Sequence, residues 1–79
     1  MTLTKGMKIK ETKQNTNPMF ENTIANSSLV YEVVKVNKKT YQLKCVEGYM
    51  KNTECKIAKD FKEEYVDIYG TRTTWKVVA

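Results

Sequence analysis

The chain has 79 residues, 41% of them hydrophobic and 29% charged, which predicts one small globular domain spanning residues 1–79. Histidine is absent, and 14 lysines and arginines outnumber 9 acidic residues, for a formal net charge of +5. The composition therefore lacks the commonest general base and the commonest transition-metal ligand. It excludes histidine-dependent catalysis, and the positive charge favours acidic partners.

The sequence contains no signal for export or membrane insertion. No apolar run at the N-terminus is long enough for a secretory signal, and no stretch approaches the roughly 20 apolar residues that cross a membrane. We therefore expect a cytoplasmic protein without membrane contact.

The two cysteines, Cys45 and Cys55, have a spacing that matches neither a zinc knuckle nor a redox pair. We expect two free, buried thiols that act as small hydrophobic side chains, with a disulfide as the alternative. We expect no metal and no cofactor.

A short strand and a short helix are the first elements predicted along the chain. Residues 7–10 alternate apolar and basic side chains, which is typical of a strand. A long polar excursion follows, from Glu11 to Ser28. Within it, Asn17 suits an N-cap and Pro18 suits the first helical position, which predicts a two-turn helix over residues 18–25. The alternative for this segment is an ordered loop.

A β-hairpin is predicted next. Residues 29–36 are rich in β-branched and aromatic side chains, and residues 37–39 provide a tight connection. Residues 40–46 then alternate, with Tyr41, Leu43 and Cys45 on one face. A hairpin with one apolar and one polar face is typical of an antiparallel sheet.

The remaining residues predict a capped turn and three more strands. A strand over 53–59 would direct Cys55 and Ile57 toward the core. Asp60 and Glu63 have the spacing of a capping box, which predicts one helical or 3₁₀ turn. Strands are then predicted over 65–69 and 73–78, the second with Trp75 as the largest apolar anchor.

These elements predict a mostly β fold. Two architectures fit: a small SH3-like barrel, which we favour, or a strongly curved antiparallel meander. Either has five to six short strands and one short helix in the 11–28 excursion. Closure or strong curvature is expected because it reduces the exposed edges of a small sheet.

The charges are unevenly distributed. Residues 35–59 hold seven lysines against two carboxylates, whereas residues 60–67 hold one lysine against four carboxylates. We expect the lysines of the hairpin tip and of its polar face to converge on one side. The candidate binding surface consists of Lys35, Lys38, Lys39, Lys44, Lys56 and Tyr49.

Two functions fit such a surface. Lysines beside an aromatic side chain are typical of sequence-tolerant DNA or RNA binding. The same surface, next to an acidic segment, also suits docking on a protein. Lysine supplies all but one of the cations. It lacks the planar guanidinium group with which arginine binds phosphate through two hydrogen bonds. We therefore favour a protein partner over nucleic acid.

A catalytic function is not expected. Glu63, Glu64 and Asp67 form a carboxylate cluster, and two carboxylates perform acid–base chemistry only when their environments differ. A solvated turn with a capping residue explains the cluster more simply. The sequence predicts a non-enzymatic binding module without catalytic residues.

Residues 31–45 (YEVVKVNKKTYQLKC) resemble small SH3-like barrel proteins of phages and prophages of low-GC Gram-positive bacteria. The similarity centres on the strand–turn–strand unit from Val33 to Tyr41, is extended by residues 59–61, and covers about half of the chain. It brings no catalytic or ligand-binding residues. It implies an accessory role in the cytoplasm of an infected cell, by binding and modulating a host or competitor protein or, alternatively, by binding nucleic acid. The oligomeric state stays open.

Overall fold

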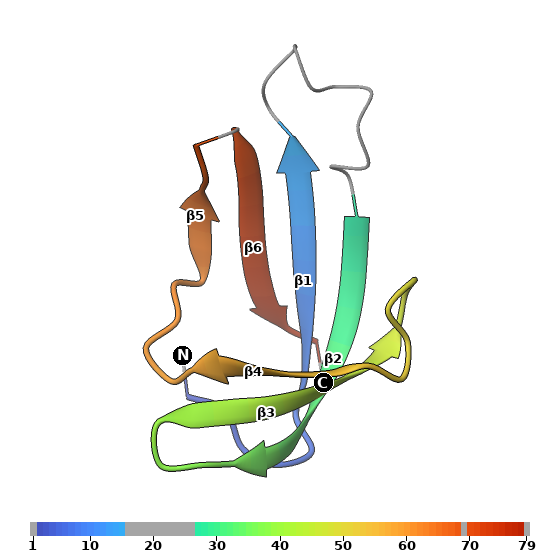
Figure 1. Ribbon diagram of the computed structural model, residues 1–79, viewed down its shortest axis with the longest axis vertical. Coiled ribbons are helices and arrows are strands. Elements are labelled where there is room, and N and C mark those ends of the chain that lie inside the picture. Colours follow the sequence, from blue (N-terminus) through green and yellow to red (C-terminus); the bar gives the residue numbers. More distant parts are fainter. Residues whose placement is uncertain (1, 16–26, 69, 79) are drawn as a thin grey trace.

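The computed structural model describes residues 2–15, 27–68 and 70–78, and this part of the chain contains six strands and no helix (Figure 1). The strands are β1 (Lys8–Asn15), β2 (Ser27–Val36), β3 (Thr40–Glu47), β4 (Glu54–Ala58), β5 (Glu64–Val66) and β6 (Thr71–Val77). They form one sheet in the order β4-β3-β2-β1-β6-β5, with every neighbouring pair antiparallel. The prediction of a mostly β fold with five to six short strands is confirmed.

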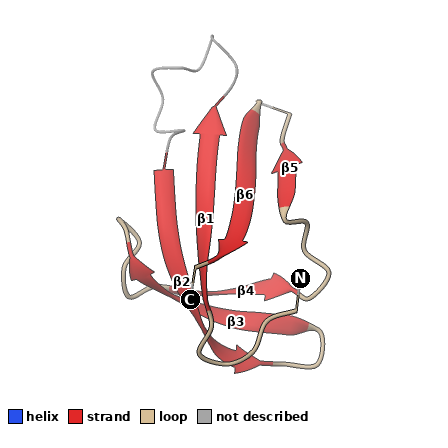
Figure 2. Ribbon diagram, turned by 180° about the vertical axis from the view of Figure 1, so that it is seen from behind, coloured by secondary structure: helices blue, strands red, loops and turns tan. Residues whose placement is uncertain are grey.

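The sheet curls where β2 pairs with β3. The register of this pair shifts between Val30 and Tyr31, where β3 has an extra residue, and again between Val33 and Lys35, where β2 has one. An extra residue in one strand of a pair bends that strand and increases its twist. As a result, β3 and β4 run across the direction of β1, β5 and β6 (Figures 1 and 2). The six strands form a curled half-barrel with β4 and β5 as its two edges, and these edges are not hydrogen-bonded neighbours in the described residues.

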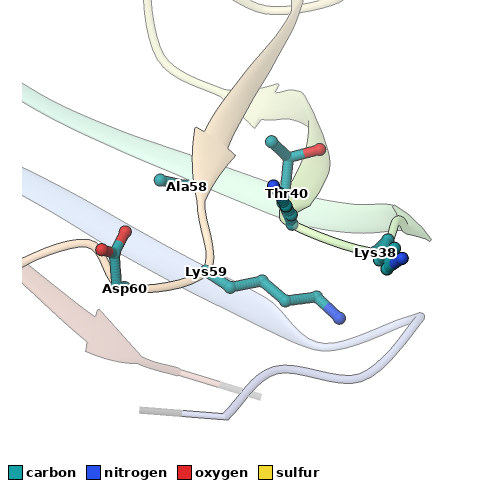
Figure 3. Close-up of a pocket in the computed structure, with 6 residues that line it drawn as sticks. Lys38, Thr40, Ala58, Lys59 and Asp60 are labelled. Carbon is teal, nitrogen blue, oxygen red and sulfur yellow. The ribbon is translucent and has the colours of Figure 1, made fainter.

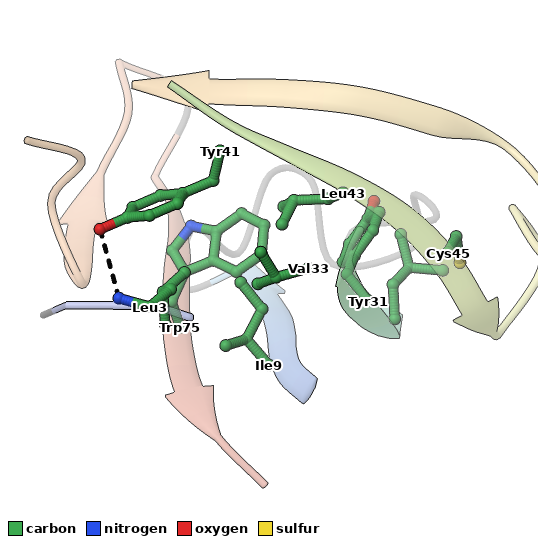
Figure 4. Close-up of a cluster of buried hydrophobic side chains, with 9 residues drawn as sticks. Leu3, Ile9, Tyr31, Val33, Tyr41, Leu43, Cys45 and Trp75 are labelled. Atoms are coloured by element: carbon green, nitrogen blue, oxygen red, sulfur yellow. Dashed lines mark hydrogen bonds between the residues drawn. The ribbon is translucent and has the colours of Figure 1, made fainter. Parts of the chain in front are cut away.

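The concave face of the half-barrel holds the core (Figure 4). The alternation predicted for residues 40–46 is confirmed, since Tyr41, Leu43 and Cys45 are all buried. The Trp75 ring lies 5.7 Å from the ring of Tyr31 and 5.9 Å from that of Phe61, between centroids, so the aromatic contacts link β6 to β2 and to the loop after β4. The buried hydrophobic residues are Leu3, Ile9, Leu29, Tyr31, Val33, Tyr41, Leu43, Cys45 and Trp75.

The segment before β1 also belongs to this core. Leu3 is buried, and its backbone N–H donates to the Tyr41 hydroxyl at 3.2 Å (Figure 4). The Gly6 N–H donates to the Val33 carbonyl, and the Val33 N–H donates to the Met7 carbonyl, each at 2.8 Å. These bonds join the N-terminal segment to β2 and β3.

The predicted excursion from Glu11 to Ser28 is wrong at both ends. β1 continues to Asn15 and β2 begins at Ser27. Polar side chains do not end β1, because its backbone pairs with β2 on one side and with β6 on the other. The helix predicted over residues 18–25 lies outside the described residues.

The prediction that both thiols are buried is correct for Cys45 and wrong for Cys55, which is exposed. Cys55 lies opposite Leu43 and therefore on the concave face, as predicted. However, it belongs to β4, an edge strand that has a neighbour on only one side. Both cysteines are free, so no disulfide is present.

The structure also corrects two boundaries near the C-terminus. The helical turn predicted at Asp60 is a single β-turn, in which the Phe61 N–H donates to the Ala58 carbonyl at 3.1 Å. The strand predicted over 65–69 is β5, which covers only residues 64–66, and β6 begins at Thr71 rather than at residue 73. Asp67 closes the connection between β5 and β6. Its N–H donates to the Thr71 carbonyl and its Oδ1 accepts from the Thr71 N–H, both at 3.0 Å.

Candidate functional site

The predicted binding surface divides into three places. Lys35, Lys44 and Lys56 lie on the outer face of β2, β3 and β4, opposite the core. Lys38 and Lys39 form the turn between β2 and β3, at the beginning of β3. Tyr49, which is 75% exposed, follows the end of β3. The length of β3 therefore separates Tyr49 from the two turn lysines.

The turn lysines border an open hollow of about 490 Å³ (Figure 3). Asn37 shapes the turn by donating from its N–H to the Thr40 carbonyl at 2.9 Å and from its side-chain amide to the Thr40 hydroxyl at 3.1 Å. Lys59 joins the same place: its Nζ lies 5.5 Å from the Tyr41 ring centroid, a distance typical of a cation–π contact. The residues that line the hollow are Lys38, Lys39, Thr40, Ala58, Lys59 and Asp60.

The outer-face lysines of β3 and β4 are balanced by carboxylates. Lys44 lies directly between Glu32 on β2 and Glu54 on β4. The side chain of Gln42, which pairs with both Lys35 and Lys56, donates to Glu54 Oε1 at 3.2 Å. Opposite charges at facing positions stabilise a sheet by a few tenths of a kcal/mol to about 1 kcal/mol. This part of the outer face is therefore explained by sheet stability.

A second basic region on the outer face was not part of the predicted binding surface. Lys8 and Lys10 on β1 and Lys76 on β6 are all exposed, and Lys10 faces Lys76 directly. We call these three residues the lysine triad. The alternation of residues 7–10 indicated that Lys8 and Lys10 share a face. The pairing of β1 with β6, which adds Lys76, joins segments far apart in the sequence and had no local signal.

The β5 edge is the most apolar exposed part of the sheet. Tyr65 is 43% exposed and Val66 is 53% exposed, and Ile68, directly after the strand, is 90% exposed. Exposed charges surround them, because Asp60, Glu63, Glu64, Asp67 and Lys62 are all at the surface. In contrast, the other edge strand, β4, presents Glu54 and Lys56 among its exposed side chains.

Among the described residues, no strand pairs with the outer side of β5. Residues 63 and 67 bond to β6: the Trp75 N–H donates to the Glu63 carbonyl at 2.7 Å, and the Asp67 N–H donates to the Thr71 carbonyl at 3.0 Å. In an antiparallel pair, alternate residues face the partner, so Tyr65 also faces β6. The N–H and C=O groups of Glu64 and Val66 therefore point away from the sheet.

Titratable side chains gather on the concave face beside β4. Glu11 lies between Leu29 and Trp75, both buried, and burial raises the pKa of its carboxyl while the charge of Lys13 lowers it. Burial, followed by the charge of Glu11, raises the pKa of the Tyr31 phenol well above its usual range. Although Cys55 is exposed at the β4 edge, partial desolvation by the concave face raises the pKa of its thiol, and Glu11 and Cys45 raise it further. A negative charge is thus disfavoured throughout this region.

Neither a metal-ligand cluster nor a membrane-spanning helix occurs in the described residues. No group of three or more His, Cys, Asp or Glu side chains is arranged to hold a metal ion there. No helix in the same residues is long and apolar enough to cross a membrane.

No protein-family model, no curated protein and no solved structure matches this chain. The candidate functions therefore rest on the geometry described above.

Proposed function

We propose that the protein is a non-catalytic binding module that binds an extended segment of a partner protein as an added strand at the β5 edge. The free backbone of Glu64 and Val66, flanked by the exposed side chains of Tyr65 and Ile68, carries this proposal. An added strand would form main-chain hydrogen bonds to those groups, and pockets between alternate side chains would select its sequence. Natural proteins normally protect the exposed edges of their sheets. The charged side chains of β4 protect that edge in this way, whereas β5 exposes apolar side chains.

The charges around β5 indicate the chemistry of the partner segment. Residues 60–67 hold four carboxylates and one lysine, all of them exposed. Arg72 on β6 offsets part of this charge, since its Nη1 lies 3.5 Å from Glu64 Oε1. An extended segment with apolar and basic side chains complements such an edge, and charge complementarity increases the association rate and the specificity.

The resemblance of residues 31–45 indicates where such a module acts. We propose that the half-barrel is a variant of the SH3-like barrel of phage accessory proteins and that it binds and modulates a host protein in the cytoplasm. The strand–turn–strand unit that carries the similarity folds as β2, the 37–39 turn and β3, which supports this assignment.

Proline substitution tests the proposal at the backbone. The Val66 N–H faces away from β6, so Val66→Pro removes an outward donor while the bonds from residues 63 and 67 to β6 remain. Lys56→Pro is the matched control on β4. The Cys45 N–H donates to the Thr53 carbonyl and the Lys59 N–H donates to the Lys39 carbonyl, so residues 53 to 59 alternate in such a way that the Lys56 N–H also faces outward.

The measurement is a pull-down from a nuclease-treated lysate of a low-GC Gram-positive bacterium. We expect the wild type and Lys56→Pro to retain the same protein and Val66→Pro to lose it. Equal retention by both proline variants would show that the β5 edge is not the site. A wild-type homodimer that Val66→Pro dissociates, measured by size-exclusion chromatography, would assign the edge to a second copy of the chain and contradict a separate partner.

A further inference from the structure

The lysine triad contains a charge arrangement that the fold does not need. Lys10 and Lys76 face each other directly across β1 and β6. Side chains at facing positions have Cβ atoms about 4.5–5.5 Å apart, and like charges at this distance destabilise a sheet. Lys8, two residues from Lys10, projects to the same face about 7 Å further along the strand.

Neighbouring side chains do not neutralise this charge. The other cross-strand neighbour of Lys10 is Val30, which is apolar. Lys8 faces Glu32, but Glu32 is shared with Lys44 on its other side. Arg72 is paired with Glu64, whereas no ion pair between described residues includes Lys10 or Lys76. The triad therefore concentrates positive charge on a part of the sheet where an external anion would relieve repulsion.

We propose that the lysine triad binds the phosphate backbone of a nucleic-acid duplex. Neighbouring phosphates along one strand of a duplex repeat over a few ångströms, so lysine side chains attached about 7 Å apart along β1 and one strand spacing apart across to β6 can contact more than one of them. Lysine contributes a mobile point charge, which suits contacts that position a duplex without reading its sequence.

The positions of the aromatic side chains favour a duplex over a single strand. Single-stranded nucleic acids are bound largely by stacking of bases on aromatic rings. The outer face of the described strands carries no aromatic side chain, because Tyr31, Tyr41 and Trp75 are buried on the concave face and Tyr65 faces the buried Thr73. Phosphate contact is the interaction that this face provides. The proposal is independent of partner binding at β5, which uses a backbone edge rather than the outer face.

Charge reversal at the triad tests this proposal. The probe is a fluorescently labelled duplex of about 20 base pairs, titrated by anisotropy at several salt concentrations. For three phosphate contacts, the slope of log K against log salt should be about −3. Lys10→Glu with Lys76→Glu should weaken binding at least about tenfold at low salt and reduce this slope by about 2.

Two controls distinguish an effect of the triad from an effect of total charge and from an effect of misfolding. Lys38→Glu with Lys39→Glu makes the same change of charge at the β2–β3 turn, and we expect it to weaken binding less than about threefold. Lys10→Glu alone replaces a like-charge pair with an opposite-charge pair, so thermal unfolding should occur at an equal or higher temperature while affinity falls.

The following results would overturn the proposal. They are absence of binding by the wild type at low salt, an equal or larger loss in the Lys38/Lys39 variant, and tighter binding to a single strand of the same length. Triad-dependent binding to anionic phospholipid vesicles without binding to the duplex would instead assign the surface to a membrane.

Discussion

The environment of Glu11 reflects the incomplete closure of the sheet. It lies on the concave face of β1, between the buried side chains of Leu29 and Trp75, yet it is itself only half-buried. A fully closed barrel would place an apolar residue here. The half-barrel accepts a carboxylate because solvent still reaches part of the side chain, at the cost of a raised carboxyl pKa.

The raised pKa of Glu11 predicts a specific pH dependence of stability. Because the folded state holds the proton more tightly than the unfolded chain, the stabilising contribution of this group is fully present below its unfolded pKa, near 4.5. The contribution is lost as the pH rises through the folded pKa. Glu11→Gln should therefore raise the urea midpoint at pH 7 and leave it nearly unchanged at pH 3. We expect a gain on the order of a few tenths of a kcal/mol at pH 7, since solvent screens a half-exposed group.

Urea unfolding curves of both proteins at the two pH values measure this difference. A lower midpoint for Glu11→Gln at pH 7 would mean that the attraction between Glu11 and Lys13 outweighs the cost of burial, contrary to the prediction.

At the scale of elements, the sequence predicted what local patterns determine. The β2–β3 hairpin could be identified because its alternation and its turn are contiguous, and Tyr41, Leu43 and Cys45 are buried as expected. Pairings between distant segments carry no such pattern. The facing of Lys10 and Lys76, the position of β5 at an edge and the exposure of Cys55 all follow from strand order, so no local pattern indicated the complete lysine triad or the free edge.

The turn between β3 and β4 depends on a glycine at its first position. Gly48 has φ of +116°, and a Cβ atom there would lie 3.0 Å from the Ser28 carbonyl oxygen and overlap the Leu29 side chain. Gly6 also has a positive φ, of +92°, but a Cβ atom there would meet open space. Substitutions at the two glycines therefore separate the free-energy cost of the backbone conformation from the free-energy cost of steric overlap.

Gly48→Ala should destabilise the protein more than Gly6→Ala. Both substitutions cost about 1–2 kcal/mol for the left-handed backbone, and overpacking against Leu29 adds about 1–3 kcal/mol at position 48 alone. Chemical denaturation of the two variants measures the difference. Equal destabilisation would indicate that β2 moves away from the turn without a measurable cost.

For the whole molecule, curvature separates the surfaces that carry function from the core. The core occupies the concave face, the lysine triad lies on the outer face, and the acidic surroundings of β5 lie at one edge. The net charge of +5 is thus unevenly distributed: the region around Lys44 is nearly balanced, the triad is uncompensated, and the β5 edge is acidic. The two proposed binding surfaces do not overlap, so the two proposals do not exclude each other.

The core should also make the sheet unfold as one unit, although its two edges are open. Trp75 is the sole tryptophan, and its contacts with Tyr31 and Phe61 connect β6 to β2 and to the loop after β4. Its fluorescence therefore reports on the core, while far-ultraviolet circular dichroism reports on all strands. We expect the two urea transitions of the wild type to coincide, as for a two-state domain.

Leu43→Ala extends this test, because Leu43 is fully buried on β3, away from Trp75 in the sheet order. The loss of a buried leucine side chain costs about 2–5 kcal/mol, and in a single cooperative unit it lowers the midpoint seen by both probes equally. Ile68→Ala is the control, since a side chain that is 90% exposed should change stability by less than about 0.5 kcal/mol. A circular dichroism transition that moves while the Trp75 transition stays in place would show that β3 and β4 unfold separately from β1 and β6.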